Sequence, residues 1–374
     1  MRLFQCQACR NIVYFENNAC ERCHHRLGFV PETQQLFALE PSGEAWALLQ
    51  GQTDTPRRFC ANACREACNW LTPPGSDALY CLACQHNHII PDLSYAAHLS
   101  AWRRVESAKH RLIYSLLRWK LPLSNRGLDP HHGLEFNFPA DPPVGAKVMT
   151  GHDNGVITVV IIEADDVERE KRRSQMHEPY RTLLGHFRHE VGHHYWDLLV
   201  RDDGKLDACR LLFGDDSQDY QAALERHYTE GPPANWQEQF VSAYASTHPW
   251  EDFAETWAHY LHIVDTLEMA SSFGMKVKPK LDDTGAQAAE INFDPYTSND
   301  LQQIIGAWLP FVFAMNSVNR AMGQGDLYPF IIAPAVVQKL DFVHKLFHKQ
   351  LQKPILGVCL SWGAERAKEK QEQG

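Results

Sequence analysis

The cysteines of this 374-residue chain are concentrated near its N-terminus. Nine of the 11 lie within the first 84 residues, and only Cys209 and Cys359 lie further along. Thiols grouped this densely in a short stretch are typical of structural zinc sites, in which a metal replaces the apolar core that so few residues cannot supply. The distribution therefore predicts a metal-stabilised region followed by a domain that folds by ordinary burial.

The first cysteine cluster has two CxxC pairs separated by ten residues. Its members are Cys6, Cys9, Cys20 and Cys23. Four thiolates at this spacing can close a tetrahedral zinc site with no open position, so we predict one structural zinc ion here. His24 and His25 follow directly and could replace a thiolate, but we expect them at the surface.

The second cluster offers five thiols for four ligand positions. Its members are Cys60, Cys64, Cys68, Cys81 and Cys84. The CxxC pair at 81–84 is expected to supply two ligands, whereas spacing alone does not choose among the first three thiols. His86 and His88 lie close by and are left out because enough thiols are present. A second structural zinc ion is predicted, since a short ribbon needs such a crosslink to fold.

Charge and hydropathy restrict the environment of the chain. The first residues contain no apolar stretch typical of a secretion signal, so we expect the protein in the reducing cytoplasm. The longest apolar runs, 156–162 and 308–315, are too short to span a membrane. The net charge is −10, and residues 1–92 carry seven Arg, no Lys and nine acids. Nonspecific nucleic-acid binding is therefore not expected, whereas a protein partner of the cysteine-rich region is compatible with this composition.

The composition changes after residue 92, where we place a domain boundary. Residues 1–92 are predicted to form tandem zinc ribbons, residues 93–362 a metal-dependent domain, and the charged segment 363–374 a disordered tail. The predicted fold class is α+β.

Periodicity gives the expected elements of the second domain. Apolar residues at helical spacing predict an amphipathic helix over 94–120. A strand at 146–150, a turn carrying His152, Asp153 and Asn154, and a strand at 155–162 follow, and most of 167–348 reads as helix. The result is a mainly helical domain with a small β-sheet.

An HExxH motif stands at residues 189–193 and is predicted to lie on a helix. The composition predicts only about 0.07 such matches by chance. His189 and His193, one turn apart, can bind one metal ion, while Glu190 is rotated aside so that its carboxylate can reach a metal-bound water as general base. Asp197, one turn after His193, is a candidate hydrogen-bond acceptor for a ligand imidazole, or else faces solvent.

A catalytic zinc ion needs a third protein ligand and an open fourth position. The extended HExxHxxGxxH pattern is ruled out because position 199 is Leu. The segment HPWEDFAETWAHYLHIVD predicts a helix beginning at Pro249, with Glu251, Glu255, His259 and His262 on one stripe. We predict Glu251 as the third ligand, with Asp252 as the alternative and Glu255 behind it as a supporting group.

HExxH followed by the EDFAE segment resembles the gluzincin metallopeptidases, in which the first Glu of such a stretch binds zinc. More specifically, the chain resembles a bacterial zinc-binding metallopeptidase family with an N-terminal zinc-ribbon region. The resemblance covers roughly residues 1–350. It is carried by CANA, CNWL and CLAC between residues 60 and 84, TGHDNGVITVVIIEADDVERE, EPYRTLLGHFRHEVGHHYWD, FGDDSQDY, HPWEDFAETWAHYLHIVDTLE and NRAMGQGDLYPF.

This resemblance implies roles that spacing alone does not supply. The family's ribbon cysteines match Cys60, Cys68, Cys81 and Cys84, and Cys64 is then an addition. In some gluzincins a Tyr seven residues before the ligand Glu stabilises the transition state, and Tyr244 stands there, with His248 as its rival.

The leading hypothesis is a zinc hydrolase of peptide bonds with one catalytic and two structural zinc ions. Residues 148–163 could form an edge strand that pairs with an extended peptide or protein substrate. A non-peptide amide substrate is an alternative within the same chemistry. The competing hypothesis is a zinc-ribbon module for binding protein or specific nucleic acid, with an inactive or structural HExxH site. Cleavage confined to residues 93–374 would argue against it.

Overall fold

The computed structural model describes residues 1–51, 55–140, 148, 150–175 and 181–352. Over these residues the chain forms two compact units. The Cys-rich unit contains Phe4–Gln85, and the helical unit contains Met1–Leu3 and His86–His348. The predicted tail at 363–374 lies outside the described residues, and the boundary at residue 92 stays a prediction.

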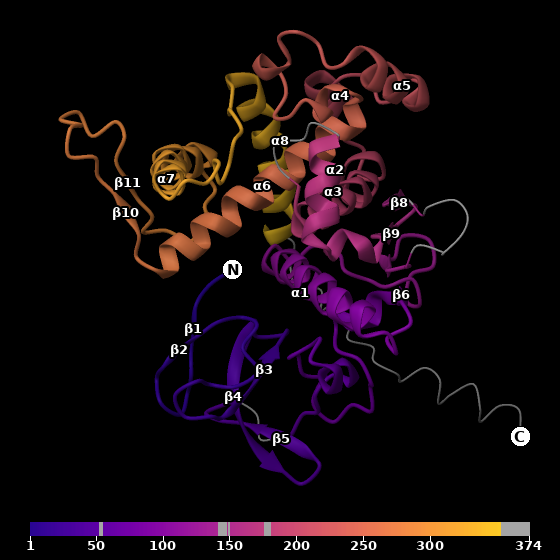
Figure 1. The fold of residues 1–374 in the computed structure, drawn as a ribbon, viewed down its shortest axis with the longest axis vertical. Helices are drawn as coiled ribbons and strands as arrows, with labels where there is room; N and C mark the ends of the chain where they lie inside the picture. The colour runs from indigo at the N-terminus through magenta and orange to yellow at the C-terminus, as the bar shows by residue number, and fades with distance from the viewer. Residues whose placement is uncertain (52–54, 141–147, 149, 176–180, 353–374) are drawn as a thin grey trace, which may run out of the picture. The chain divides into compact units, whose positions relative to one another are not determined.

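The Cys-rich unit is built from short antiparallel strands (Figure 1). They are β1 (Phe4–Gln5), β2 (Ile12–Val13), β3 (Arg26–Val30), β4 (Gln35–Ser42) and β5 (Ala45–Leu48). Strands β1 and β2 pair as a hairpin, and β3, β4 and β5 form a sheet in that order. Short 3-10 helices lie at Ala61–Arg65 and Cys84–His86.

The two cysteine clusters share one apolar core. Phe29 in β3 hydrogen-bonds to the carbonyl of Asn69, and Leu71 N donates back to the carbonyl of Phe29, both at 2.9 Å. The rings of Phe29 and Trp70 lie 4.6 Å apart in the interior. A Cβ at Gly28 would come within 2.9 Å of side-chain atoms of Leu71, so only glycine allows this approach. The segment after Cys68 is therefore packed on the sheet that follows the first cluster.

The helical unit is mainly α-helix with a small sheet, which confirms the predicted α+β class. Its helices are α1 (Ala96–Arg118), α2 (Asp166–Gln175), α3 (Leu183–Trp196), α4 (Leu206–Phe213), α5 (Tyr220–Glu230), α6 (Pro249–Ser272), α7 (Leu301–Ala321) and α8 (Pro334–Gln352). Its strands are β6 (Asn87–Ile89), β7 (Glu135–Asn137), β8 (Gly151–Asp153), β9 (Val156–Thr158), β10 (Lys276–Val277) and β11 (Ala289–Glu290).

The four-stranded sheet has the order β6-β7-β9-β8, so β8 is an edge strand. The prediction for this hairpin was wrong in register, because His152 and Asp153 belong to a strand and the turn is Asn154–Gly155. Both turn residues have positive φ, 46° and 82°, which a tight two-residue hairpin requires and which Asn and Gly adopt readily. Part of the strand predicted at 146–150 lies outside the described residues.

Helices α3 and α6 lie side by side and form the centre of the helical unit (Figure 1). They approach closely where Gly192 faces Ala254, since a Cβ at Gly192 would lie 3.1 Å from the Ala254 Cα. One turn further along, the Tyr195 and Trp257 rings stack with centroids 5.2 Å apart. This apolar packing fixes the distance between α3 and α6.

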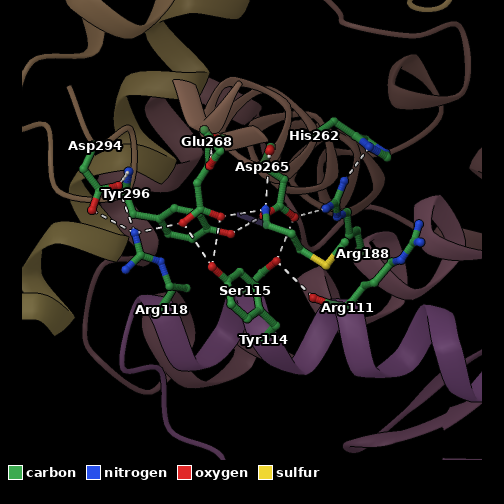
Figure 2. Close-up of polar contacts among 12 residues, drawn as sticks. Arg111, Tyr114, Ser115, Arg118, Arg188, His262, Asp265, Glu268, Asp294 and Tyr296 are labelled. Carbon is green, nitrogen blue, oxygen red and sulfur yellow. Dashed lines mark hydrogen bonds and ion pairs between the residues drawn. The ribbon is translucent and has the colours of Figure 1, made fainter. Parts of the chain in front are cut away.

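A buried polar network joins α6 to its neighbours (Figure 2). Asp265 accepts hydrogen bonds from Ser115 Oγ at 2.8 Å and from Arg188 and Tyr296. The amino group of Met1 lies 2.9 Å from the same carboxylate. Since Ser115 belongs to α1 and Arg188 to α3, this carboxylate holds three helices together.

Among the described helices, α7 is long and apolar enough to cross a membrane by length and composition. Half of its apolar window is buried within the protein.

Candidate metal centre

Helix α3 carries the HExxH motif and begins at a side-chain cap. Thr182 Oγ1 accepts a hydrogen bond from Gly185 N at 3.0 Å, which satisfies one of the N–H groups of the first turn. His189 and His193 lie one turn apart on this helix. Their Nε2 atoms are 3.2 Å from each other, close enough to bind a single ion.

Helix α6 supplies the facing carboxylates from its first two turns. His248 is its N-cap, with Nδ1 accepting from Trp250 N at 3.1 Å, and Pro249 occupies the first helical position. Glu251 is 1% exposed, and Glu255 lies one turn further along. Glu251 lies in the first turn of the helix, where the helix dipole favours negative charge.

The structure brings together His189, His193 and Glu251, the three predicted ligands. Glu251 Oε2 lies 2.9 Å from His189 Nε2 and 3.4 Å from His193 Nε2. Burial alone would raise the pKa of Glu251, but the two imidazoles hold it well below its ordinary value. The carboxylate is therefore ionised, as a metal ligand must be.

This donor set fits zinc. Tetrahedral bonds of about 2.0–2.1 Å to nitrogen and oxygen put neighbouring ligand atoms about 3.3 Å apart, close to the three separations observed. Glu251 Oε2 is buried and makes no well-formed hydrogen bond with any residue that the structure describes. A buried carboxylate oxygen that faces two imidazole nitrogens without a well-aligned hydrogen bond is what a cation between them would satisfy.

The ligand His189 is oriented by a carboxylate from the opposite helix. Its Nδ1 lies 2.8 Å from Glu255 Oε1, and Ser242 Oγ donates to Glu255 Oε2 at 2.6 Å. Such a carboxylate fixes the imidazole tautomer and presents Nε2 to the metal. Glu255 has the supporting position expected from the sequence. Ser242 was missed, because a lone serine before a helix carries no recognisable signal.

Two other acids that the sequence offered have different partners. Asp252, the alternative ligand, lies 2.6 Å from Lys339 Nζ on α8 and is not in the ligand group. Asp197, the candidate acceptor for an imidazole, pairs instead with Arg201 at 2.6 Å. Asp197 keeps the regular helical spacing from His193, since its N–H donates to the His193 carbonyl, but its carboxylate pairs with Arg201 within the π-helical turn Asp197–Arg201.

Glu190 lies on the same helix as the two histidines and is partly buried. Burial raises its pKa to about 7 in the metal-free protein, while His189 lowers it and Glu251 and Glu255 raise it. A carboxylate with a pKa near neutrality can both take up and release a proton at physiological pH. These are the properties of a general base.

The two candidates for transition-state stabilisation have different environments. Tyr244 begins a 3-10 turn at Tyr244–Ser246, and its ring lies 5.9 Å from that of His189. His248 uses both ring nitrogens elsewhere, since Nδ1 caps α6 and Nε2 contacts the Gln218 carbonyl at 3.2 Å. His248 therefore serves the fold, and Tyr244 is the better candidate.

Edge strand β8 runs beside the metal-binding helix. The ring of His152 in β8 lies 6.0 Å from that of His193 and 6.1 Å from that of Trp250. Trp250 in turn packs on His193, with ring centroids 3.7 Å apart. Strand β8 thus lies beside the ligand His193.

The Cys-rich unit contains two four-thiol groups, and in each group the four sulfurs lie within 4.8 Å of one another. The groups are Cys6, Cys9, Cys20 and Cys23, and Cys60, Cys68, Cys81 and Cys84. The Cys6–Cys23 and Cys9–Cys20 sulfurs are 3.6 Å apart, and those of Cys68 and Cys81 are 3.7 Å apart. Zinc–sulfur bonds of about 2.3 Å in a tetrahedron require about 3.8 Å. Both groups therefore fit closed zinc sites.

Cys64, the fifth thiol of the second cluster, stands outside its group. It is exposed, and its Sγ donates to the Ala61 carbonyl at 2.9 Å. Spacing did not determine which two of Cys60, Cys64 and Cys68 are ligands. The turn at Ala61–Arg65 points Cys64 outward and so leaves Cys60 and Cys68 in the group.

Comparison with known proteins gives two family matches. Residues 98–346 match a family described as "Putative zinc-binding metallo-peptidase", and residues 3–95 match a zinc-ribbon domain. Uncharacterised proteins of Mycobacterium bovis and of two strains of Mycobacterium tuberculosis are each 43% identical over 345 residues, covering 92% of this chain and 94% of theirs. No solved structure matches.

Proposed function

Because this chain belongs to the zinc-binding metallopeptidase family, we propose that it is a zinc-dependent hydrolase that cleaves peptide bonds. The observation that carries the proposal is the convergence of His189 and His193 from α3 with Glu251 from α6. Three protein ligands with one open position are typical of catalytic zinc, whereas four thiolates are typical of structural zinc.

In this proposal, three residues bind the metal ion and a fourth transfers the proton. His189, His193 and Glu251 hold the zinc ion, which when bound supplies a Lewis acid that polarises the scissile carbonyl and acidifies water. Glu190 accepts the proton of the attacking water and passes it to the leaving amine. Its partly buried place on α3, next to the ligand His189, suits this exchange.

Two further features support a peptide substrate. The Tyr244 hydroxyl is proposed to donate to the oxygen that gains negative charge in the transition state. Edge strand β8 is proposed to bind the substrate backbone as an added strand. Among the described strands only β9 pairs with β8, so a substrate strand would pair with the opposite edge of β8. The two four-cysteine groups hold structural zinc in this proposal, so each chain binds three zinc ions.

The mechanism is tested by Glu190→Gln, which keeps the shape of the side chain but removes the base. We expect the variant to keep its zinc and to lose about 10²–10⁴-fold in turnover. Zinc is measured by elemental analysis, and cleavage by mass spectrometry of a peptide library and by release of dye from labelled casein. Glu225→Gln, an exposed change on α5, is the matched control.

Equal turnover by wild type and Glu190→Gln would contradict the mechanism. Metal analysis of Glu251→Ala tests the ligand set separately, with an expected loss of one of three zinc ions. Retention of all three ions in that variant would show that Glu251 is not a ligand.

A further inference from the structure

The loop that leads into α5 is docked on the start of α6. Gly214 has a φ of 101° and lies so close to α6 that a Cβ on it would be 3.3 Å from Pro249 Cγ. Four residues later, the carbonyl of Gln218 accepts a hydrogen bond from His248 Nε2 at 3.2 Å. His248 Nε2 carries the proton because Nδ1 is the acceptor for Trp250 N.

Tyr220 follows this loop as the first residue of α5, with Asp219 as N-cap. Its hydroxyl donates to Glu251 Oε1 at 2.6 Å. Its ring lies edge-on to those of His248 and Trp250, with centroids 5.4 and 5.8 Å away. The ring is therefore held by the same residues that begin α6, and its hydroxyl is directed at the carboxylate.

The two oxygens of Glu251 consequently have different surroundings. Oε2 faces the Nε2 atoms of His189 and His193, and Oε1 is engaged by Tyr220. We propose that Tyr220 is a positioning residue of the metal centre, which holds Glu251 as a one-oxygen ligand and so keeps a coordination position open. This role rests on the proposed function, because it requires a metal ion between the three ligands.

The physical reason lies in the freedom of a glutamate side chain. A carboxylate can bind zinc through one oxygen or through both, and rotation about its last torsion exchanges the two arrangements. A short hydrogen bond from a neutral hydroxyl to an ionised oxygen is among the stronger hydrogen bonds in proteins. It keeps Oε1 away from the metal, so that the fourth position stays available for water or substrate.

The contact also separates the roles of two neighbouring tyrosines. The one proton of the Tyr220 hydroxyl is used on Glu251, so Tyr220 does not serve as donor to substrate. A tyrosine hydroxyl, with an ordinary pKa of about 10, is a neutral donor at physiological pH.

The test is Tyr220→Phe in the full chain with both cysteine groups loaded with zinc. The third site is titrated with zinc against a competing chelator and, separately, with cobalt(II). We expect zinc affinity to fall about 10–100-fold, the range seen when a partner of a metal ligand is removed. The visible absorption of cobalt should weaken, as it does when a four-coordinate ion gains a fifth ligand.

Tyr95→Phe is the matched control, because Tyr95 is 61% exposed and lies at the N-cap of α1, outside the metal centre. The Glu251→Ala background provides a second test, which compares two variants with each other and so does not depend on Tyr220→Phe alone. Titrated with excess zinc, the His189–His193 pair that is left in Glu251→Ala should still bind weakly. If Tyr220 acts through Glu251, adding Tyr220→Phe lowers this residual zinc affinity no further.

Unchanged zinc affinity and cobalt absorption in Tyr220→Phe would overturn the role, as would an additional loss in the double variant. A wild-type chain that binds only two zinc ions would overturn the proposed function and this role together. A chain that binds three ions and cleaves no peptide would leave the role of Tyr220 supported while contradicting the proposed function.

Discussion

The two cysteine groups and the His/Glu centre obtain their ligands in different ways. In the first cysteine group, both CxxC pairs form the same turn, in which the N–H of Arg10 or His24 donates to the carbonyl of the first cysteine at 2.8 or 2.9 Å. Both residues have positive φ. The His/Glu centre instead joins α3 to α6, and Glu251 lies 58 residues after His193 in the chain.

This difference teaches which contacts support each kind of site. A knuckle is a local turn that presents two sulfurs by itself, so the metal is needed to join knuckles and thereby to fold the unit. The ligands of the His/Glu centre are brought together by packing that does not involve the ligands, at Gly192 and around Asp265. A cysteine site is therefore expected to lose its metal when a ligand is substituted. The His/Glu centre is expected to lose metal affinity also when a packing residue that is not a ligand is substituted.

The largest effect is expected from removing one thiolate. Cys81→Ser should abolish the second four-thiol group and unfold the Cys-rich unit, because structural zinc contributes about 10–16 kcal/mol of apparent binding free energy in small domains. Zinc content and hydrogen exchange of residues 4–85 provide the measurement. Cys64→Ser is the control and should change stability by less than about 0.5 kcal/mol. Unfolding by Cys64→Ser instead would show that the ligand group has been misassigned.

An intermediate effect is expected from the buried network of the helical unit. Asp265→Asn leaves Arg188 buried without its counter-charge, which should reduce the free energy of unfolding by about 3–5 kcal/mol. Urea denaturation followed by circular dichroism measures this loss. Asp341→Asn, which breaks an exposed pair with Lys345 on α8, should cost less than about 1 kcal/mol.

The effect of Asp265→Asn should depend on pH with a defined sign. Burial alone would raise the pKa of Asp265, but the amino group of Met1, Arg188 and Tyr296 hold it well below its ordinary value. A depressed pKa in the folded state contributes stability above the unfolded value of about 3.9, and this contribution is lost as the pH falls. The difference in the free energy of unfolding between wild type and Asp265→Asn should be constant from about pH 6 to 5 and should shrink below about pH 4. A difference that grows on acidification would contradict the assignment.

The smallest effect is expected where the two helices touch. In Gly192→Ala the new methyl group would lie 3.1 Å from the Ala254 Cα and 3.2 Å from Trp257 Cδ1, so the helices must separate slightly. We expect a loss of about 1–3 kcal/mol in stability and weaker zinc binding by the His/Glu centre alone. Gly306→Ala on α7, where a Cβ has nothing within 4 Å, is the matched control. Equal zinc affinity in both variants would show that the spacing of α3 and α6 does not limit the site.

Much of the architecture could be predicted from local signals. Helical periodicity predicted a helix over 94–120, and α1 spans Ala96–Arg118. The mainly helical stretch predicted for 167–348 contains α3 to α7 and most of α2 and α8. The resemblance to the metallopeptidase family with a zinc ribbon is confirmed by both family matches. The hairpin at 151–158 was misplaced because His152 and Asp153 were assigned to the turn and Gly155, a turn residue, to the following strand.

The sequence by itself determined the types of metal ligand and their local spacing: paired thiols, two histidines one turn apart, and acids at the start of a helix. It did so because knuckles, helical periodicity and caps depend on residues within one or two turns. Only the tertiary structure decided which thiol stands outside the second group, that Asp252 faces Lys339, and that Ser242 and Tyr220 support the centre. These contacts join segments through packing at Gly192, Gly214 and Asp265, and the free energy of such packing is not encoded in any local pattern.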